Sequence, residues 1–364
     1  MTMTSVTGAR RQPSDPTAPL RVAVANALSP AEIDRLASSD PRLEVIADTD
    51  LLPPQRFPGD FAGDPAFVRS PAQQTSFEHL LKSADILFGI PDLDPSTLKG
   101  ILDSNAKLRW VHTMAAGGGS QISAAGLSDE QLQRVIFTTS AGVHARPLAE
   151  FALLGLLAGA KSMPRLLQQQ YDRRWTERWH MGQLSSMTVL LVGYGSIGRE
   201  IASILHGLGT RVIATTRRPI ETHLVDEFIA PTDIASTAGR VDAIVVSLPG
   251  TAATANLVDR RVLEALRPGA ILVNVGRGSV VEHTALVQAL QSGHLGFAAL
   301  DVVANEPLSP DDALWNQPNV LISPHTAALT ADEGKRIIDL FAVNARRLFE
   351  HRPLINTVNT VEFY

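Results

Sequence analysis

Residues 193–198 have the spacing that brings a peptide backbone close to a phosphate. They follow the apolar run 188–192, precede a helical pattern, and read Gly193-Tyr194-Gly195-Ser196-Ile197-Gly198. In the order strand, turn, helix, the first glycine allows a tight turn and the second lets the backbone approach a pyrophosphate, while the third permits close helix packing. The free N–H groups at the start of a helix also attract phosphate. The segment therefore predicts a dinucleotide-binding site.

The end of the next predicted strand, 211–215, indicates which dinucleotide this site prefers. A site for NAD usually places an acidic residue there to bind the ribose 2′-hydroxyl. Here Thr216 stands at that position, followed by Arg217 and Arg218. Because guanidinium groups suit a 2′-phosphate, the sequence predicts that NADP(H) is preferred and that NAD(H) is possible. The alternative role for the two arginines is that of solvated surface charges.

Two further polar residues follow apolar strand patterns. Arg277 comes after 270–275, and a guanidinium can hold both oxygens of a carboxylate. His325 comes after 319–323, and an imidazole can lose and regain a proton near neutral pH. Open parallel sheets bind ligands at the carboxyl ends of their strands, which favours functional roles for both residues. A structural salt bridge for Arg277 and a packing role for His325 remain the alternatives.

The elements that must position these groups are short apolar runs that alternate with helical patterns. The predicted strands are 21–27, 42–47, 84–89, 108–113 and 134–139, then 188–192, 211–215, 242–248, 270–275, 296–300 and 319–323. The second series is continuously apolar, as strands buried on both faces of a parallel sheet are. The alternation predicts an α/β protein with doubly wound parallel sheets. Residues 48–75, rich in Pro, Gly and Asp, are predicted to form a long surface loop, whose role stays open.

Length and composition narrow the classes of protein. A chain of 364 residues predicts two domains, and a net charge of −5 gives no electrostatic reason to bind nucleic acid or an anionic membrane. There are no cysteines and the histidines lack metal-binding spacing, so we expect no metal site and a cytoplasmic location. Residues 1–20 have no apolar segment of the kind found in signal peptides and predict a disordered lead-in.

Several segments taken together resemble the D-isomer-specific 2-hydroxyacid dehydrogenases. They appear in the order VLLVGYGSIGREIA, DAIVVSLPGTAATANLV, LRPGAILVNVGRGSVVEHTALVQALQSGHL, AALDVVANEPL and PNVLISPHTAALT. The resemblance extends from about residue 84 to 329. Thr215 to Arg218 and the segment SAGVHARPLAE are most similar to the glyoxylate/hydroxypyruvate reductase branch.

The resemblance implies a reductase that passes hydride from NAD(P)H to the carbonyl carbon of a small 2-oxo acid. Arg277 would bind the substrate, His325 would be the general acid/base, and Glu306 would orient the histidine ring and favour its charged form. The turn Ala116-Gly117-Gly118-Gly119 would bind the substrate carboxylate, although the family usually has Ala-Gly-Val-Asp there. The positions that would line the cofactor, beyond the glycine turn and residues 216–218, are Leu248, Pro249, Thr254, Val275, Gly276 and Asp301.

The resemblance also implies the domain plan. A Rossmann-type cofactor domain (142–327) would be inserted into a flavodoxin-like substrate domain (21–141 and 328–364), with the site in a cleft between them and a homodimer as the assembly. A phosphite-type dehydrogenase and a dinucleotide-sensing corepressor on the same scaffold remain alternatives. His112 could face the cleft or serve in the core. The sequence leaves open which 2-oxo acid is the substrate and in which direction the reaction runs.

Overall fold

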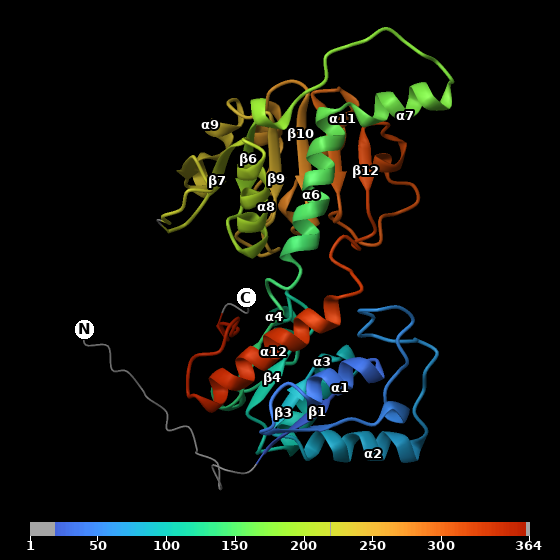
Figure 1. Ribbon diagram of the computed structural model, residues 1–364, viewed down its shortest axis with the longest axis vertical. Helices are drawn as coiled ribbons and strands as arrows, with labels where there is room; N and C mark the ends of the chain where they lie inside the picture. Colours follow the sequence, from blue (N-terminus) through green and yellow to red (C-terminus); the bar gives the residue numbers. More distant parts are fainter. Residues whose placement is uncertain (1–18, 219, 362–364) are drawn as a thin grey trace, which may run out of the picture. The chain divides into compact units, whose positions relative to one another are not determined.

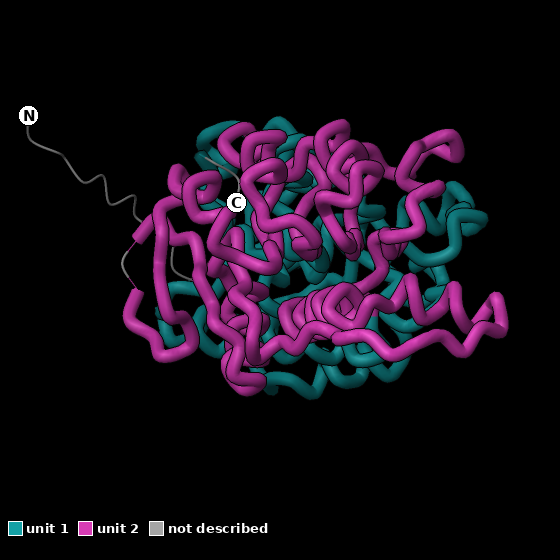
Figure 2. The backbone as a smooth tube through the Cα atoms, turned by 90° about the horizontal axis from the view of Figure 1, so that it is seen from above, with its two compact units in different colours: residues 1–143, 330–364 teal, residues 144–329 magenta. Residues whose placement is uncertain are grey.

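The computed structural model describes residues 19–218 and 220–361, which divide into two compact units (Figure 2). Unit 1 comprises Met1–Val143 and Thr330–Tyr364, and unit 2 comprises His144–Leu329. The division thus falls after Val143 and Leu329, where the sequence predicted 141 and 327. Most of the predicted lead-in lies outside the described residues, and its last residue, Leu20, already belongs to the first strand.

Unit 1 contains a parallel sheet in the order β2-β1-β3-β4-β5. Its strands are β1 (Leu20–Val24), β2 (Leu43–Ile46), β3 (Ile86–Phe88), β4 (Trp110–His112) and β5 (Ile136–Thr138). Its helices are α1 (Pro30–Ala37), α2 (Pro71–Lys82), α3 (Pro95–Ser104), α4 (Gly119–Ala124), α5 (Asp129–Arg134) and α12 (Glu333–Phe349), with 3₁₀ turns η1 (Thr49–Leu51) and η2 (Pro91–Leu93). This is the flavodoxin-like strand order that the resemblance implied.

Aromatic packing explains why the end of the chain returns to unit 1. Phe341 of α12 stacks on Trp110 of β4 with ring centroids 4.4 Å apart and meets Phe88 of β3 edge-on at 5.0 Å. All three side chains are fully buried. Such pairs stabilise a fold beyond the apolar area that they bury, so α12 covers one face of the sheet as an integral part of the core.

His112 lies in the same core and takes the packing role that the sequence left open. Its Nδ1 is 2.8 Å from Thr138 Oγ1 and its Nε2 is 3.2 Å from Ser140 Oγ, while Trp110 Nε1 donates to Thr138 Oγ1 at 2.7 Å. Burial lowers the pKa of His112 to about 3, because the interior cannot solvate an imidazolium. The folded protein therefore holds this ring neutral.

We expect His112 to make the protein less stable in mild acid. The unfolded chain binds a proton near pH 6.5, whereas the folded chain does so only near pH 3, so stability is full above pH 6.5 and is lost between these values. The wild type should lose about 2 kcal/mol of unfolding free energy from this group between pH 7 and pH 5. Urea unfolding should show a smaller loss in His112→Gln, while the exposed-site control His79→Gln keeps the wild-type loss. Equal losses in all three proteins would contradict the assignment.

The long segment after β2 is partly helical, which corrects the predicted loop over 48–75. Ser70 caps α2 by accepting from the Gln73 N–H, the Gln73 side chain accepts from the Ser70 N–H, and Pro71 occupies the first helical position. This capping box and the proline start the helix at Pro71, inside the predicted loop. Residues 52–70 remain without helix or strand.

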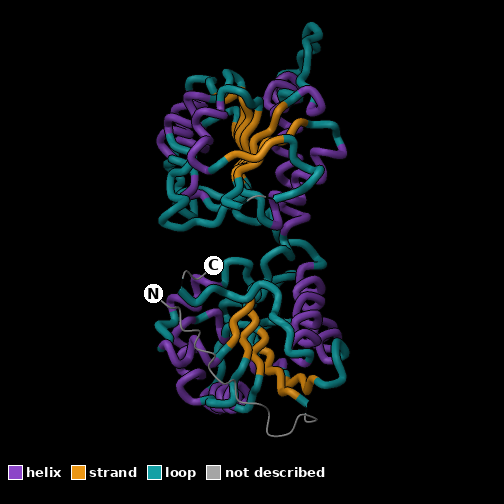
Figure 3. The backbone as a smooth tube through the Cα atoms, turned by 90° about the vertical axis from the view of Figure 1, so that its left-hand side faces the viewer, coloured by secondary structure: helices purple, strands orange, loops and turns teal. Residues whose placement is uncertain are grey.

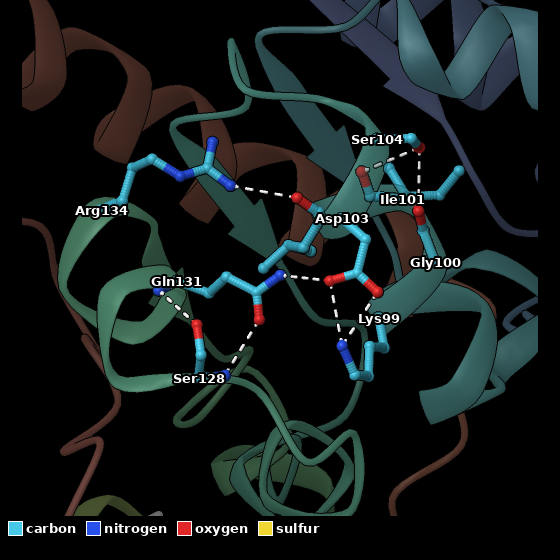
Figure 4. Close-up of polar contacts among 9 residues, drawn as sticks. Lys99, Gly100, Ile101, Asp103, Ser104, Ser128, Gln131 and Arg134 are labelled. Atoms are coloured by element: carbon cyan, nitrogen blue, oxygen red, sulfur yellow. Dashed lines mark hydrogen bonds and ion pairs between the residues drawn. The ribbon is translucent and has the colours of Figure 1, made fainter.

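Helix α5 is fastened to α3 through a polar cluster that is drawn in Figure 4. Gln131 Nε2 donates to Asp103 Oδ1 at 2.8 Å, and Lys99 Nζ pairs with the same carboxylate at 2.9 Å. Hydrogen bonds from Lys99 and Gln131 lower the pKa of the Asp103 carboxyl. Arg134 adds a hydrogen bond to the Leu102 carbonyl at 3.2 Å. The cluster holds the chain in place between the glycine turn at 116–119 and β5.

Unit 2 contains a parallel sheet in the order β12-β11-β10-β9-β6-β7-β8, with helices on both faces (Figures 1 and 3). Its strands are β6 (Thr188–Val192), β7 (Arg211–Thr215), β8 (Glu227–Ile229), β9 (Ala243–Val246), β10 (Ala270–Asn274), β11 (Leu295–Leu300) and β12 (Val320–Ile322). Its helices are α6 (Ala145–Ala160), α7 (Met163–Tyr171), α8 (Ser196–Gly207), α9 (Ile234–Ala238), α10 (Arg260–Ala265) and α11 (His283–Gln291), with 3₁₀ turns η3 (Leu184–Ser186), η4 (Pro231–Asp233), η5 (Gly278–Val280) and η6 (Ala313–Asn316).

The sheet of unit 2 confirms the predicted doubly wound architecture. Read from its other edge, the order β8-β7-β6-β9-β10-β11-β12 is the Rossmann order extended by one strand. The strands β6, β9 and β10 are buried along nearly all of their length, as their continuous apolar sequences predicted. The chain changes direction across the sheet between β6 and β9, which is where such sheets bind ligands. None of the described helices is long and apolar enough to cross a lipid bilayer.

Candidate active site

The glycine turn after β6 has the geometry of a phosphate cradle. Gly193 has φ +114°, and its N–H donates to Thr215 Oγ1 at 2.8 Å, which ties the turn to the end of β7. A Cβ on Gly198 would lie 2.2 Å from the Gly193 carbonyl oxygen, so only glycine lets the helix approach so closely. A Cβ on Gly195 would meet no described atom within 4 Å. The space beside Gly195 is therefore open to a ligand.

The first turn of α8 supplies the donors for that space. The helix begins at Ser196, and its first hydrogen bond runs from the Arg199 N–H to the Gly195 carbonyl at 3.0 Å. The N–H groups of Ser196, Ile197 and Gly198 therefore precede the helical ladder, and Gly195 has no side chain to cap them. Free N–H groups and the positive end of the helix dipole bind phosphate well. The residues present fit the pyrophosphate of a dinucleotide.

The end of β7 carries the residues predicted to select the dinucleotide. Thr216 Oγ1 donates to the Arg218 carbonyl at 2.6 Å and accepts from the Arg218 N–H at 3.2 Å, which closes a tight turn. Arg217 and Arg218 are both exposed beyond that turn. The Thr216 hydroxyl therefore stabilises the turn. At the end of β7, the guanidinium groups of Arg217 and Arg218 could contact a 2′-phosphate.

Three neighbouring strands, β10, β11 and β12, bring the predicted catalytic residues to one edge of the sheet. Their last paired residues, Asn274, Leu300 and Ile322, lie in one row of the sheet. Along the chain, Arg277 follows β10, Glu306 follows β11 and His325 follows β12. Because parallel strands share the direction of their carboxyl ends, the three segments leave the sheet on the same side as the glycine turn.

His325 and Glu306 form a direct pair at this edge. His325 Nδ1 lies 2.7 Å from Glu306 Oε2, and the two side chains are 44% and 37% exposed. Glu306 Oε1 accepts from the Val303 N–H at 3.1 Å, which fixes the carboxylate. With Nδ1 held by Glu306, Nε2 is the ring nitrogen that remains for another partner.

Arg277 reaches the same region through its backbone. A Cβ on the neighbouring Gly278 would lie 1.9 Å from the Val303 backbone, so the Arg277 turn packs tightly on the segment that holds Glu306. Asn274 Nδ2 donates to the Arg277 carbonyl at 3.2 Å and steadies the turn. The exposed guanidinium donates Nη1 to the Gly276 carbonyl at 2.9 Å. His325 and Glu306 thus meet side chain to side chain, while Arg277 is joined to them through packed backbone.

Comparison with known proteins places this chain in one family. Residues 153–327 match the model of the NAD-binding domain of D-isomer-specific 2-hydroxyacid dehydrogenases. A glyoxylate reductase of Aeropyrum pernix is 32% identical over 239 residues, which cover 62% of this chain and 70% of that protein. The chain belongs to the D-isomer-specific 2-hydroxyacid dehydrogenase family. It is therefore an oxidoreductase, as the sequence predicted.

Solved structures of this dehydrogenase family share the fold. A family member from Xanthobacter autotrophicus, in complex with NADPH and MES, has a TM-score of 0.74 and 25% identity, covering 95% of this chain and 100% of the other. An NADPH-dependent glyoxylate/hydroxypyruvate reductase of Sinorhizobium meliloti, in complex with NADP and malonate, has a TM-score of 0.63 and 27% identity, covering 95% of this chain and 98% of the other.

In this dehydrogenase, the carboxylate of Asp301 accepts hydrogen bonds from the turn that carries His325; we call these bonds the Asp301 clasp. Its Oδ1 accepts from Ser323 Oγ at 2.7 Å, from the Thr326 N–H at 3.0 Å and from the Ala327 N–H at 2.9 Å. Its carbonyl accepts from the His325 N–H at 2.9 Å. His325 has φ +56°, an uncommon conformation for a residue other than glycine. The sequence predicted a cofactor contact for Asp301, and the structure shows that one carboxylate oxygen is committed to this clasp.

The other predicted cofactor residues lie in the segments that follow β9 and β10. Leu248 is the nearest neighbour of a Cβ on Gly193, at 2.9 Å, and its carbonyl lies 2.6 Å from a Cβ on Gly276. Thr254 Oγ1 donates to the Pro249 carbonyl at 2.6 Å and closes the loop after β9. The Val275 N–H donates to the Val246 carbonyl at 3.0 Å, which extends the pairing of β9 and β10.

The predicted substrate-binding turn of unit 1 follows β4. Ala116 and Gly117 are exposed, whereas Gly118 is buried and donates its N–H to the Ala115 carbonyl at 3.3 Å. Gly118 therefore serves the turn itself, and the exposed N–H groups of Ala116 and Gly117 are the better placed donors for a carboxylate. Gly119 begins α4.

Three supporting residues of the site were not predicted from the sequence. Thr215 accepts from the Gly193 N–H, Ser247 Oγ donates to the Gly193 carbonyl at 3.2 Å, and Asn274 Oδ1 accepts from the Gly276 N–H at 3.0 Å. Each is a small polar residue at or just beyond the carboxyl end of a buried strand. That position is the sequence signal that could have found them.

Proposed function

We propose that this protein reduces a small 2-oxo acid to the D-2-hydroxy acid with a nicotinamide dinucleotide, preferably NADPH. The observation that carries the proposal is the His325–Glu306 pair, at 2.7 Å, on the same sheet edge as Arg277 and an open glycine turn. This set offers a proton, a cation and a phosphate cradle, which are the groups that reduction of a 2-oxo acid requires.

His325 delivers the proton in the proposed reaction. When both ring nitrogens are protonated, Nδ1–H donates to Glu306 Oε2 and Nε2–H is free to protonate the substrate oxygen. The bound dinucleotide supplies hydride to the carbonyl carbon. Glu306, fixed by the Val303 N–H, keeps the ring oriented while the proton leaves.

Arg277 binds the substrate carboxylate in this proposal. Its guanidinium has donors in a planar fork that matches the two oxygens of a carboxylate, and among the described residues only its Nη1 has a hydrogen-bond partner, the Gly276 carbonyl. The N–H groups of Ala116 and Gly117 are proposed as further donors to a carboxylate. Positioning by fixed donors lowers the entropic cost of reaching the transition state.

A spectrophotometric screen of 2-oxo acids with NADPH and with NADH tests the proposal. We expect glyoxylate and hydroxypyruvate to be reduced, with the D-isomer as the product of hydroxypyruvate. Glyoxylate reductases among the relatives support the choice of these two acids. Binding of NADPH without reduction of any 2-oxo acid would overturn the proposal and favour a sensing role.

We expect kcat/KM to be higher with NADPH than with NADH because Arg217 and Arg218 follow β7, at the position where a Rossmann-type sheet with an arginine accommodates the 2′-phosphate. Loss of a charge-assisted contact to phosphate costs about 1.5–3 kcal/mol, so Arg217→Ala/Arg218→Ala should lower kcat/KM for NADPH by about 10- to 150-fold. The value for NADH should stay nearly unchanged. The exposed pair Arg260→Ala/Arg261→Ala is the matched control. An equal effect on both cofactors would contradict a 2′-phosphate contact.

A homodimer through α7 is also proposed. None of the residues of α7 is buried, and Leu167, Tyr171 and the nearby Trp175 are exposed. In Figure 1 α7 and the following segment stand away from the sheet of unit 2. Exposed apolar surface of this kind favours association with a second copy. Light scattering should give about twice the mass of 39.1 kDa, and a monomer mass would contradict the proposal.

A further inference from the structure

Residues 354–358, which follow α12, run along one edge of the sheet of unit 1, and we call them the edge segment. In the order β2-β1-β3-β4-β5, the last strand has a neighbouring strand on one side. On its other side Thr357 forms an antiparallel bridge with Thr138, and the Val358 N–H donates to the Phe137 carbonyl at 2.9 Å. The edge segment therefore satisfies backbone groups that an edge strand would otherwise expose.

The edge segment is anchored firmly in unit 1. Its residues Leu354 and Val358 are buried and belong to the same hydrophobic core as α12. Asn344 of α12, which is fully buried, bonds Ile355 in both directions. Its Nδ2 donates to the Ile355 carbonyl at 3.0 Å, and its Oδ1 accepts from the Ile355 N–H at 2.7 Å. The segment can therefore hold other residues in place.

Asn356, in the middle of the edge segment, holds the chain that follows β5. Its Nδ2 donates to the Ala141 carbonyl at 2.6 Å and to the Thr139 carbonyl at 3.3 Å. Its own carbonyl accepts from the Thr139 N–H at 3.1 Å. The backbone of Asn356 is left-handed, with φ +56°, a conformation in which asparagine is enriched. The residue between these contacts, Ser140, is thus fixed from both sides.

Ser140 joins the chain after β5 to the chain after β4. Its Oγ donates to the Thr113 carbonyl at 2.9 Å, and its N–H donates to the Ala115 carbonyl at 3.4 Å. Ser140 and Thr113 are both fully buried, so water does not compete for these bonds. A hydrogen bond in such surroundings is stronger than one in water.

The direction of the bonds around Ser140 follows from a donor at the far end of the same network. Trp110 Nε1 can only donate, so Thr138 Oγ1 accepts from it and donates its own proton to His112 Nδ1. The neutral ring then carries its proton on Nε2, which donates to Ser140 Oγ at 3.2 Å. The Ser140 hydroxyl proton is left for the Thr113 carbonyl. This network favours a single arrangement of Ser140.

Thr113 carries the contact into the turn at 116–119. Its Oγ1 donates to the Ala115 carbonyl at 3.1 Å, and the Gly118 N–H donates to the same oxygen at 3.3 Å. A Cβ on Gly118 would lie 1.9 Å from Thr113 Oγ1, so the turn lies directly on this side chain. The position of the turn therefore depends on Thr113 and Ser140.

We propose that Asn356 is a positioning residue for the substrate carboxylate: through Ser140 and Thr113 it holds the turn whose N–H groups bind that carboxylate. The assignment rests on the proposed function, because it takes the N–H groups of Ala116 and Gly117 as donors to the 2-oxo acid. Asn356 acts through other residues. Its contribution is to keep two donors in place, so that substrate binding does not have to order them.

Hydrogen–deuterium exchange of the full chain tests the link without a substrate. Asn356→Gly removes the side-chain bonds, while glycine adopts the left-handed backbone without strain. We expect peptides that cover residues 113–122 to exchange about tenfold faster than in the wild type, the factor that corresponds to about 1.4 kcal/mol, or one hydrogen bond. Ser140→Ala, which removes the next bond in the chain, should have the same effect.

Asn105→Ala is the matched control for Asn356→Gly. Asn105 is also an asparagine of unit 1 that binds backbone groups, since its Nδ2 donates to the Ala84 carbonyl at 2.8 Å and to the Leu81 carbonyl at 3.3 Å. It precedes β4, whereas the turn at 116–119 follows this strand. Exchange over residues 113–122 should therefore stay within about twofold of the wild-type rate in this control.

Steady-state kinetics with glyoxylate and saturating NADPH give the second readout. Asn356→Gly should raise the KM for glyoxylate about tenfold and leave kcat within about twofold, because a carboxylate contact made equally in the ground and transition states changes KM alone. The affinity for NADPH should stay unchanged. The double variant Asn356→Gly/Ser140→Ala should have a KM close to that of the more affected single variant, because both residues act through one chain of bonds.

The possible failures are distinguishable. Wild-type exchange over residues 113–122 in Asn356→Gly overturns the link. Faster exchange with a wild-type KM for glyoxylate overturns the positioning role and leaves the proposed function standing, as does an equal rise in KM in Asn105→Ala, which would report a general loss of stability. A wild type that reduces no 2-oxo acid overturns the proposed function, and the positioning role falls with it.

Discussion

Replacing His325 with alanine is expected to lower kcat for 2-oxo acid reduction by about 10²- to 10⁴-fold, the usual contribution of a positioned general acid. Nε2 of this ring is the proposed proton donor, since Nδ1 is held by Glu306 at 2.7 Å. Without the imidazole, water must protonate the developing alkoxide. NADPH affinity, followed by the change in nicotinamide fluorescence on binding, should stay close to that of the wild type, because the phosphate cradle lies after β6.

His283 provides a matched control for this variant. It also pairs with a carboxylate, Asp312, at 3.0 Å, but it begins α11 instead of following a strand. His283→Ala removes the same class of ion pair from the same unit and should leave kcat within a few-fold of the wild type. Glu306→Gln, which keeps a hydrogen-bonding side chain beside Nδ1, should lower kcat less than His325→Ala does. A wild-type kcat in His325→Ala would refute the assignment of the acid.

Removal of the Arg277 guanidinium should be the second large loss. Arg277→Ala should lower kcat/KM for glyoxylate by about 30- to 5,000-fold, from the 2–5 kcal/mol that truncating one partner of a paired charge costs. Arg277→Lys keeps the charge but loses the planar fork, so its value should fall between those of alanine and wild type. Steady-state kinetics with varied glyoxylate and saturating NADPH measure both.

The control for Arg277 is an exposed arginine of unit 2 that belongs to α10. Arg261 is 84% exposed and pairs with Asp259 at 2.9 Å beside α10. Arg261→Ala should leave kcat/KM for glyoxylate unchanged. If Arg277→Ala instead raises the KM for NADPH by the same factor as the KM for glyoxylate, the guanidinium serves the cofactor and the carboxylate assignment is wrong.

Much of the sheet of unit 2 was predictable because its strands are buried on both faces. The runs 188–192 and 211–215 coincide with β6 and β7, and the other predicted strands differ from the observed ones by only a few terminal residues. β8 was missed because Glu227–Ile229 is a short, partly exposed edge strand with no apolar run. Burial leaves a pattern in the sequence, whereas an edge position leaves almost none.

The site residues divide in the same way. The positions of Arg277 and His325 could be predicted because residues that follow strands in parallel sheets gather at one edge, whereas Glu306 was implied by the resemblance to the dehydrogenase family. The Asp301 clasp and the path of the segment 52–70 could not be predicted, because they depend on hydrogen bonds between distant segments. The pair of Arg69 with Asp92 and the bond from Gln55 to Ala27 are examples. Such contacts follow from the path of a loop, which has no periodic pattern.

The bonds that Asp301 makes to residues 323–327 have a consequence for protein engineering. The turn that carries His325, the proposed general acid, cannot be grafted as a short peptide, because the left-handed backbone at residue 325 is held by the carboxylate of Asp301, just beyond the neighbouring strand. A transplant into another Rossmann-type sheet would have to bring both strand ends together. A mutational scan would likewise rank Asp301 with the proposed reacting groups, because its Oδ1 holds the turn that carries His325.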